Sequence, residues 1–293
     1  MIIVLAEVFR QAELPKGVMN IIFGDGPGTG STLVRSPRIQ GVSFIGRAET
    51  IMQIRKDTAG DFGKHLCFDL RGISPTVVFE DVNIVQAVDA AARAAFDNNG
   101  QLCASGSVIY VHRSIYAAFL QMLKAYMEIN PEFYLKVGPV VSKERYDKIR
   151  SLLLQARGEG AMFMTGGIPE RVPNRGFWVN PTVLCNVHPD SRLAREAMLG
   201  PVAVVCPFDG EEVVKLCNDN PNAVSALVMT DDLRRMRRVA QHLDAELMWA
   251  NCRLGGELGA GFNDIRATGS GRKACQRSRD EFTTLRTMHF PAY

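Results

Sequence analysis

The sequence has no excess of charge of one sign and no long apolar run, and both absences exclude classes of protein. Its 34 basic and 31 acidic residues leave a formal net charge of +3, with no Lys or Arg run that would follow a phosphate backbone. We therefore expect no nucleic acid partner. No stretch approaches the roughly 20 apolar residues that cross a bilayer, and the apolar start meets Glu7 without a basic leader. The sequence predicts a cytoplasmic protein without membrane contact.

Cysteine and histidine are present, but not in the arrangements that metal sites or disulfide frameworks require. The cysteines are odd in number and never form a C-x-x-C pair, and the histidines have no metal-like spacing. We expect no metal, and reduced thiols that are mostly buried. The seven cysteines lie at positions 67, 103, 185, 206, 217, 252 and 275.

What the sequence does contain is an alternation of strand-like and helix-like segments, which predicts an α/β fold with a parallel sheet. A chain of 293 residues that is 46% hydrophobic and 22% charged can build one large core or two domains. Strands are expected at 18–23, 41–45, 65–68, 75–80, 108–111, 202–205, 226–229, 247–249 and 283–290. Helices are expected at 4–13, 29–35, 47–58, 84–96, 113–129, 142–157, 211–218 and 232–243.

Helix 84–96 has the clearest local signals. Asp81, Val82 and Asn83 precede it and can cap its first turn. Its apolar residues recur at helical spacing, which predicts one buried face. That face is Ile84, Val85, Val88, Ala91, Ala92, Ala95 and Phe96.

Cys103 and Asp69 are the candidate catalytic residues. Cys103 follows a helix-ending Asn-Asn-Gly and precedes Ala-Ser-Gly-Ser, a turn that would expose a thiol beside backbone N–H groups. The alternative is a cysteine that simply packs in the core. Asp69 ends a buried strand and is a candidate general base. Alternatively it caps a turn or pairs with a cation such as Arg71.

The glycine run at 24–30 leaves two interpretations open. It follows a predicted strand and opens a predicted helix, as a dinucleotide-binding loop does, but Thr29 stands where the last glycine of G-x-G-x-x-G belongs. The run is either a phosphate cradle or a tight turn.

Taken together, the ordered motifs resemble the aldehyde dehydrogenase superfamily over essentially the whole chain. The Asn251–Cys252 and Gly256–Gly259 segments, with the 278–283 tail, most resemble the branch that oxidises 2-aminomuconic semialdehyde. The matching segments are 14–20 to the family's LPxGVxN, 42–47 to VxFTGS, 68–75 to LELGGKxP, 100–103 to GQxC, 196–202 to EEIFGPV, 249–251 to WVN and 262–272 to PFGGxKxSGxGRE.

The resemblance implies the domain organisation. It implies a partial Rossmann-like cofactor-binding domain over 1–70, which begins partway through the family's cofactor domain. An α/β catalytic thiol domain follows over 71–270, and a C-terminal oligomerisation strand lies within 271–293. A homo-oligomer is therefore expected.

The resemblance also implies a reaction. The thiolate of Cys103 adds to an aldehyde to give a thiohemiacetal, NAD or NADP accepts the hydride, and water attacks the resulting thioester with help from Asp69. The product is a carboxylic acid. The cofactor would lie against Gly46, Arg47, Leu70 and Leu199.

Several site positions depart from the family's pattern. The family has Glu where this chain has Asp69, and the cofactor ribose is held by a Glu where this chain has Ala197. Leu199 replaces a Phe beside the nicotinamide, and Arg47 replaces a small hydroxyl residue at the pyrophosphate. These departures imply a weakened cofactor site. The alternative function is therefore a catalytically impaired or inactive member acting through oligomer or partner contacts.

Overall fold

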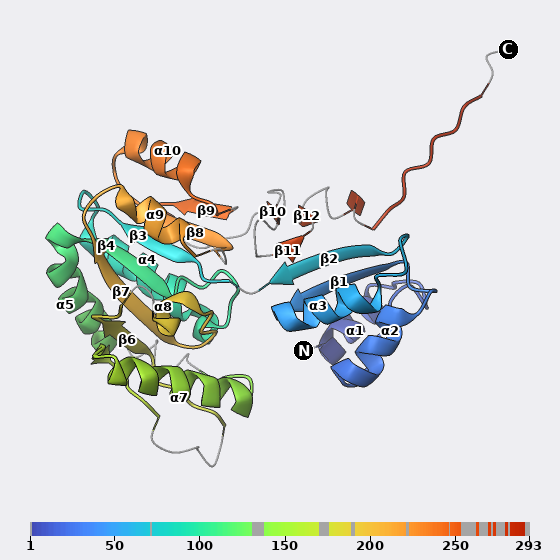
Figure 1. Ribbon diagram of the computed structural model, residues 1–293, viewed down its shortest axis with the longest axis horizontal. Helices are drawn as coiled ribbons and strands as arrows, with labels where there is room; N and C mark the ends of the chain where they lie inside the picture. The colour runs from blue at the N-terminus through green and yellow to red at the C-terminus, as the bar shows by residue number, and fades with distance from the viewer. Residues whose placement is uncertain are drawn as a thin grey trace. The chain divides into compact units, whose positions relative to one another are not determined.

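The computed structural model of the chain divides into two compact units, Met1–Cys67 and Phe68–Tyr293 (Figure 1). No helix in the described ranges is long and apolar enough to cross a membrane. The ranges described are 2–70, 72–130, 138–169, 176–188, 191–220, 223–245, 247–252, 262–263, 269–270, 272–273, 279–280 and 282–290.

The first unit has little core. Among its described residues, only Val34, Ile51, Ile54 and Cys67 are buried apolar side chains, and α1 buries none of its side chains. Its elements are α1 (Ile2–Gln11), a π-helical turn η1 (Gly26–Gly30), α2 (Ser31–Arg35), β1 (Gly41–Gly46), α3 (Ala48–Asp57) and the start of β2 (His65–Leu70).

A buried lysine supports this small core. The Lys64 side chain is 1% exposed, and its Nζ donates hydrogen bonds of 2.8 Å to the carbonyl oxygens of Val34 and Ser36. An ion pair of 3.4 Å joins it to Asp61. The ammonium thus satisfies carbonyl groups at the end of α2 that the helix itself leaves without partners.

The predicted strand at 18–23 is wrong. The segment is irregular, and Val18, Ile22 and Phe23 are 66%, 60% and 69% exposed. Its composition suits a buried strand, but a strand forms only where a neighbour pairs with its backbone, and no described strand lies beside it.

The glycine run after that segment is a turn closed by its own side chain. Asp25 Oδ1 accepts a hydrogen bond of 2.7 Å from the Gly28 N–H. Thr32 Oγ1 donates 2.8 Å to the Gly28 carbonyl oxygen. The Asp25 carboxylate takes an N–H that a phosphate cradle would need, which favours the tight-turn interpretation.

The second unit is built on a seven-stranded sheet in the order β5-β6-β7-β4-β3-β8-β9. Its strands pair in parallel except β5 with β6. The predicted α/β class is therefore confirmed. The strands are β3 (Pro75–Val78), β4 (Val108–His112), β5 (Met162–Thr165), β6 (Thr182–Cys185), β7 (Val202–Phe208), β8 (Ser225–Met229) and β9 (Leu247–Ala250).

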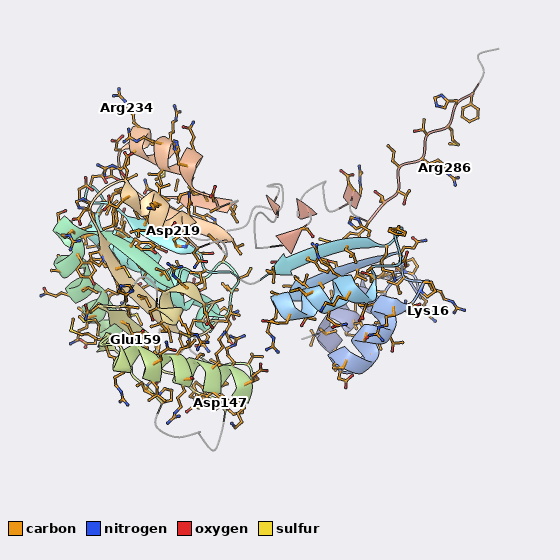
Figure 2. All side chains as sticks on the ribbon, viewed as in Figure 1. Lys16, Asp147, Glu159, Asp219, Arg234 and Arg286 are labelled. Carbon is orange, nitrogen blue, oxygen red and sulfur yellow. The ribbon has the colours of Figure 1, made fainter. Side chains whose placement is uncertain are left out.

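Helices cover both faces of this sheet. One face packs against α4 (Ile84–Phe96) and α5 (Arg113–Ile129). The other packs against α7 (Lys143–Gly158) and α8 (Arg192–Arg195) over β6 and β7, and against α9 (Glu212–Asn218) and α10 (Leu233–His242) over β3 and β8. Charged side chains such as Asp147, Glu159 and Arg234 lie on the outside of these layers (Figure 2).

Most predicted elements of the second unit are present, with some differences. Asn83 Oδ1 caps α4 by accepting from the Val85 and Gln86 N–H groups, as expected. Val85 was expected on the buried face but is 60% exposed, because it lies at the edge of the apolar stripe in the first turn. Short elements went unpredicted, namely β5, β6, α8 and the two-residue strands β10 (Phe262–Asn263), β11 (Gly269–Ser270) and β12 (Arg272–Lys273).

The strand expected at 283–290, with a partner in another sheet or subunit, stays a prediction. These residues form no ladder with any described strand, and Leu285, Met288 and Phe290 are 93%, 68% and 80% exposed. The side chains near Arg286 are drawn along this tail in Figure 2. Period-two alternation indicates a strand, but the backbone partner must come from elsewhere.

Candidate functional site

Two loops of the second unit meet at one edge of its sheet, the loop before β4 and the loop before β7. β4 lies between β3 and β7, and the parallel registers align Pro75 with Val108 and Val108 with Val204. The chain before each strand therefore reaches the same edge, the one where the strands begin. Cys103 precedes β4 and Leu199 precedes β7, while Asp69 lies in β2, the strand that comes before β3 in the sequence.

The turn before Cys103 has an unusual backbone. Asn98 and Asn99 have φ of 51° and 62°, and Gly100 follows at 63°, so three consecutive residues are left-handed. This conformation costs about 1 kcal/mol or more for a residue with a Cβ, and Asn tolerates it better than most. The predicted turn is thus present, in a form that needs support from outside it.

Gly100 brings the cysteine turn against the loop before β7. A Cβ on Gly100 would lie 2.2 Å from the Gly200 carbonyl oxygen and 3.0 Å from that of Ala95. Only glycine allows this approach. The structure therefore brings the Cys103 turn and the Leu199–Gly200 loop together.

The chain after Cys103 is fastened to the end of α4. Ser105 Oγ donates hydrogen bonds of 3.3 Å and 3.1 Å to the carbonyl oxygens of Ala94 and Ala95. The Gly106 N–H donates 2.8 Å to the Ala94 carbonyl oxygen. Cys103 thus lies, half-buried, on a short segment that is fixed at both ends.

Cys103 is half-buried, whereas the cysteines of the core are buried. Burial raises the pKa of Cys185 and Cys217, and raises that of Cys206 to about 12. These thiols stay protonated at neutral pH and are poor nucleophiles. Cys67 is buried as well, and Cys252 is exposed. The expectation of mostly buried cysteines is confirmed for the described ones, while Cys275 lies outside the described residues.

Asp69 is buried, at 5% exposure, as the second-last residue of β2. The last residues of β2 pair antiparallel with β11, which aligns Asp69 with Gly269. Leu70 follows it at the strand end, and Arg71 lies outside the described residues. The position is that of a carboxylate held on a strand rather than on a loose turn.

The carboxylate of Glu196, in the same loop as Leu199, already pairs with two cations. Leu199 has a left-handed backbone, with φ of 47°. Glu196 Oε1 accepts a hydrogen bond of 2.5 Å from Arg192 Nε, and its Oε2 lies 3.2 Å from Lys148 Nζ. Ala197 has no polar side-chain atom, so this loop offers no unengaged carboxylate between 196 and 199 to a ligand.

Gly46 and Arg47 lie in the first unit, at the junction of β1 with α3. Gly46 is buried, and Arg47 is exposed at the N-cap of α3. Because a guanidinium has no acceptor, the Arg47 side chain cannot cap the first-turn N–H groups of this ten-residue helix, and the helix has no side-chain cap. An uncapped helix N-terminus beside a guanidinium has the chemistry that binds an anionic group.

The opposite edge of the sheet, where the strands end, is filled by polar contacts. Asp81 accepts hydrogen bonds from Thr230 Oγ1 and the Asp232 N–H, and Arg235 pairs with both Glu80 and Asp81. Among the described residues no group of three or more His, Cys, Asp or Glu side chains forms a metal site. The candidate chemistry therefore concentrates at the Cys103 edge.

The structure adds residues that the sequence did not single out. Asn99 Nδ2 donates to the Gly138 carbonyl oxygen at 2.9 Å, and Gln101 Oε1 accepts from the Val141 N–H at 3.0 Å. These contacts connect the cysteine turn to a segment about forty positions away. The signals in the sequence were the Asn-Asn-Gly tract, which local chemistry explains equally well as a helix end, and the place of Gln101 in the GQxC-like segment.

Comparisons of the sequence and of the structure with known proteins both lead to the same family. A sequence model described as "Aldehyde dehydrogenase family" matches residues 1–288. The 2-aminomuconic semialdehyde dehydrogenase of Mus musculus is 35% identical over 296 residues, which cover 96% of this chain and 60% of that protein. The betaine aldehyde dehydrogenase of Sinorhizobium fredii is 36% identical over 292 residues, 97% of this chain and 60% of that protein.

The fold agrees as well. An NAD+ complex of an aldehyde dehydrogenase from Bacillus cereus superposes with a TM-score of 0.89 at 31% identity, covering 97% of this chain and 58% of that one. This chain thus spans about 60% of the length of the relatives it matches. The match of the family model over residues 1–288 shows that this chain belongs to the aldehyde dehydrogenase family.

Proposed function

We propose that this chain performs an NAD(P)-dependent oxidation of an aldehyde in which Cys103 is the nucleophile and Asp69 the base. The observation that supports the proposal is the close approach of the Cys103 turn to the Leu199–Gly200 loop, at the sheet edge where β4 and β7 begin. The first unit would supply the cofactor-binding domain and the second the catalytic domain.

In the proposed reaction Cys103 acts first. Its thiolate adds to the carbonyl carbon of an aldehyde, and backbone N–H groups of the surrounding turn would stabilise the resulting oxyanion. Bound NAD(P) would supply the hydride acceptor. Asp69 then takes a proton from the water that attacks the Cys103 thioester, which releases a carboxylic acid and the free thiol.

The described residues fit the cofactor in part. The uncapped N-terminus of α3, with Gly46 and Arg47, suits a pyrophosphate. Leu70 and Leu199 would provide apolar contact. Ala197 cannot accept a hydrogen bond from a ribose hydroxyl, and Glu196 is held by Arg192 and Lys148. We therefore expect nucleotide binding to be weaker than in family members that keep a carboxylate at this position.

The test is formation of NAD(P)H from an aldehyde by the wild-type chain and by Cys103→Ser, with 2-aminomuconic semialdehyde and betaine aldehyde, the aldehydes named for its relatives, among the substrates. We expect turnover in the wild type and none in Cys103→Ser. Cys252→Ser, which removes an exposed thiol away from the cysteine turn, is the matched control and should keep activity. No nucleotide binding by calorimetry would refute the dehydrogenase.

A second candidate is a non-catalytic family member that acts through assembly. Ala197 and the engaged Glu196 favour it, as do the exposed apolar side chains of the 282–290 tail. We propose that this tail pairs with a second copy in a cytoplasmic homo-oligomer. Light scattering on the full chain and on a form ending at residue 281 would test this. If the two forms have the same number of subunits per particle, the proposal is contradicted.

A further inference from the structure

The left-handed turn before Cys103 is held by contacts from outside it, and Asn99 makes the most direct one. Its side-chain N–H donates a hydrogen bond of 2.9 Å to the Gly138 carbonyl oxygen, and the residue is 6% exposed. Asn98 has the same backbone conformation but is exposed, and its side chain makes no hydrogen bond within the described part of the chain. Two adjacent asparagines therefore have different surroundings.

The segment that receives the Asn99 hydrogen bond is itself fixed. Val140 is buried, and its N–H donates 2.8 Å to the Phe177 carbonyl oxygen. Ser142 caps α7 by accepting from the Arg145 N–H at 3.2 Å. The segment Gly138–Ser142 is thus anchored to the core and to a helix, and it can act as a rigid support.

Hydrogen bonds carry this support from Asn99 to Cys103. The Gln101 N–H donates to the Asn98 carbonyl oxygen, and the Ser105 N–H donates to that of Leu102. These two successive turns link residues 98–105, and Ser105 is fastened to α4. We therefore expect a change in the Asn99 contact to shift the segment that carries the thiol.

Stability alone does not explain Asn99. Its Oδ1 is buried and accepts no hydrogen bond from the described residues. A buried amide that is satisfied on only one side is unfavourable, and such groups in folded proteins call for a further reason. The left-handed backbone at the same residue is a second unfavourable feature.

We propose that Asn99 is a positioning residue for Cys103, and that its hydrogen bond to Gly138 fixes the place of the thiol at the sheet edge. The inference rests on the proposed role of Cys103 as nucleophile. Asn99 itself has no contact with substrate in this proposal and acts through the turn.

The test is the alkylation of Cys103 by iodoacetamide, measured per peptide by mass spectrometry on the full chain without nucleotide. Exposed Cys252 in the same molecule serves as the internal standard. In the wild type the rate constants of the two thiols should differ, because Cys103 is held half-buried. Asn99→Gly keeps the left-handed backbone and removes the amide, and it should move the ratio towards one by about tenfold. Asn98→Gly, the same change at the exposed neighbour, should leave the ratio unchanged.

Each other outcome is decisive. An unchanged ratio in Asn99→Gly, even with a lower melting temperature, would make Asn99 a purely structural residue and overturn the proposal. An equal change in Asn98→Gly would assign the effect to glycine itself, and a ratio of one in the wild type would show that the thiol is not positioned. If Asn99→Gly does not fold, Asn99→Asp replaces the N–H donor with an acceptor at nearly the same shape, with Asn98→Asp as its charge-matched control. Lack of NAD(P)H formation would bear only on the proposed function, since alkylation needs neither nucleotide nor hydride transfer.

Discussion

At the scale of the residue, Gly100 has little freedom to change. Its φ of 63° opposes any side chain, and so does the Gly200 carbonyl oxygen, which would lie only 2.2 Å from a Cβ at this position. We expect Gly100→Ala to lower the free energy of unfolding by about 2 to 4 kcal/mol, from the left-handed backbone and the overlap together. Urea denaturation measures it.

Gly158→Ala is the matched control for Gly100→Ala. Gly158 is the last residue of α7, and a Cβ there meets nothing within 4 Å. Alanine should be neutral or stabilise by about 0.5 kcal/mol, because it reduces the freedom of the unfolded chain. Equal stability of Gly100→Ala and the wild type would mean that the cysteine turn can open away from Gly200.

Glu196, in the loop before β7, should make the stability of the fold depend on pH. The hydrogen bond from Arg192 lowers the pKa of Glu196 below its ordinary value of 4.5, although burial opposes the shift. A carboxyl group whose pKa is lowered by folding stabilises the fold above its unfolded pKa, and this contribution is lost as the pH falls through the folded pKa. Glu196→Gln should therefore be less stable than the wild type at pH 7, and the difference should shrink below about pH 4.5.

Thermal unfolding over a pH series checks this, with Glu13→Gln as the control. Glu13 is exposed and has no ion pair with a described residue. Its substitution removes a carboxylate without breaking an ion pair among the described residues, so the melting temperature should stay close to that of the wild type. A Glu196→Gln difference that stays constant down to about pH 3 would show that the Arg192 contact does not persist in solution.

At the scale of the element, α4 depends on its cap. Asn83 Oδ1 accepts hydrogen bonds of 3.1 Å and 3.2 Å from the Val85 and Gln86 N–H groups. Asn83→Ala should lower the free energy of unfolding by about 1 kcal/mol, because these N–H groups lose their acceptor. Asn83→Asp retains an acceptor and should remain close to the wild type. If Asn83→Asp lowers the free energy of unfolding as much as Asn83→Ala does, Asn83 contributes through something other than its cap.

Elements with their own local signals were predictable from the sequence, and elements that depend on a partner were not. The cap and apolar stripe of α4 lie within the helix, and the buried strands β3, β4 and β8 have apolar runs bounded by turn residues. The segment 18–23 has equally good strand composition but finds no pairing partner among the described strands. Strand propensity indicates that a segment fits a half-buried sheet, but the local sequence does not determine which element packs against it.

The candidate site shows the same limit. Cys103 and Asp69 were found because motifs of contiguous residues mark them. Asn99 and Gln101 gain their importance from Gly138 and Val141, about forty positions away. That proximity arises from the order of β4, β7 and α7 in the fold, which periodicity cannot specify.

At the scale of the whole molecule, the two units differ greatly in buried core, and this predicts different local stabilities. In the second unit Val77, Val78, Ile109 and Val111 are fully buried in β3 and β4, which lie in the interior of the sheet. In the first unit α1 buries no side chain, and an isolated helix of ten residues is marginal in water. Local opening should therefore be frequent in α1 and rare in β3 and β4.

Hydrogen–deuterium exchange on the full chain measures this difference directly. Amides of α1 and of residues 18–25 should exchange within seconds to minutes, and those of β3 and β4 over hours, on the order of a thousandfold slower or more. The helix α3, which buries Ile51 and Ile54, should lie between them and serves as the comparison within the first unit. If α1 proves as protected as β4, then Ile3, Val4 and Val8, which are more than half exposed in the single chain, must be covered by another chain in solution.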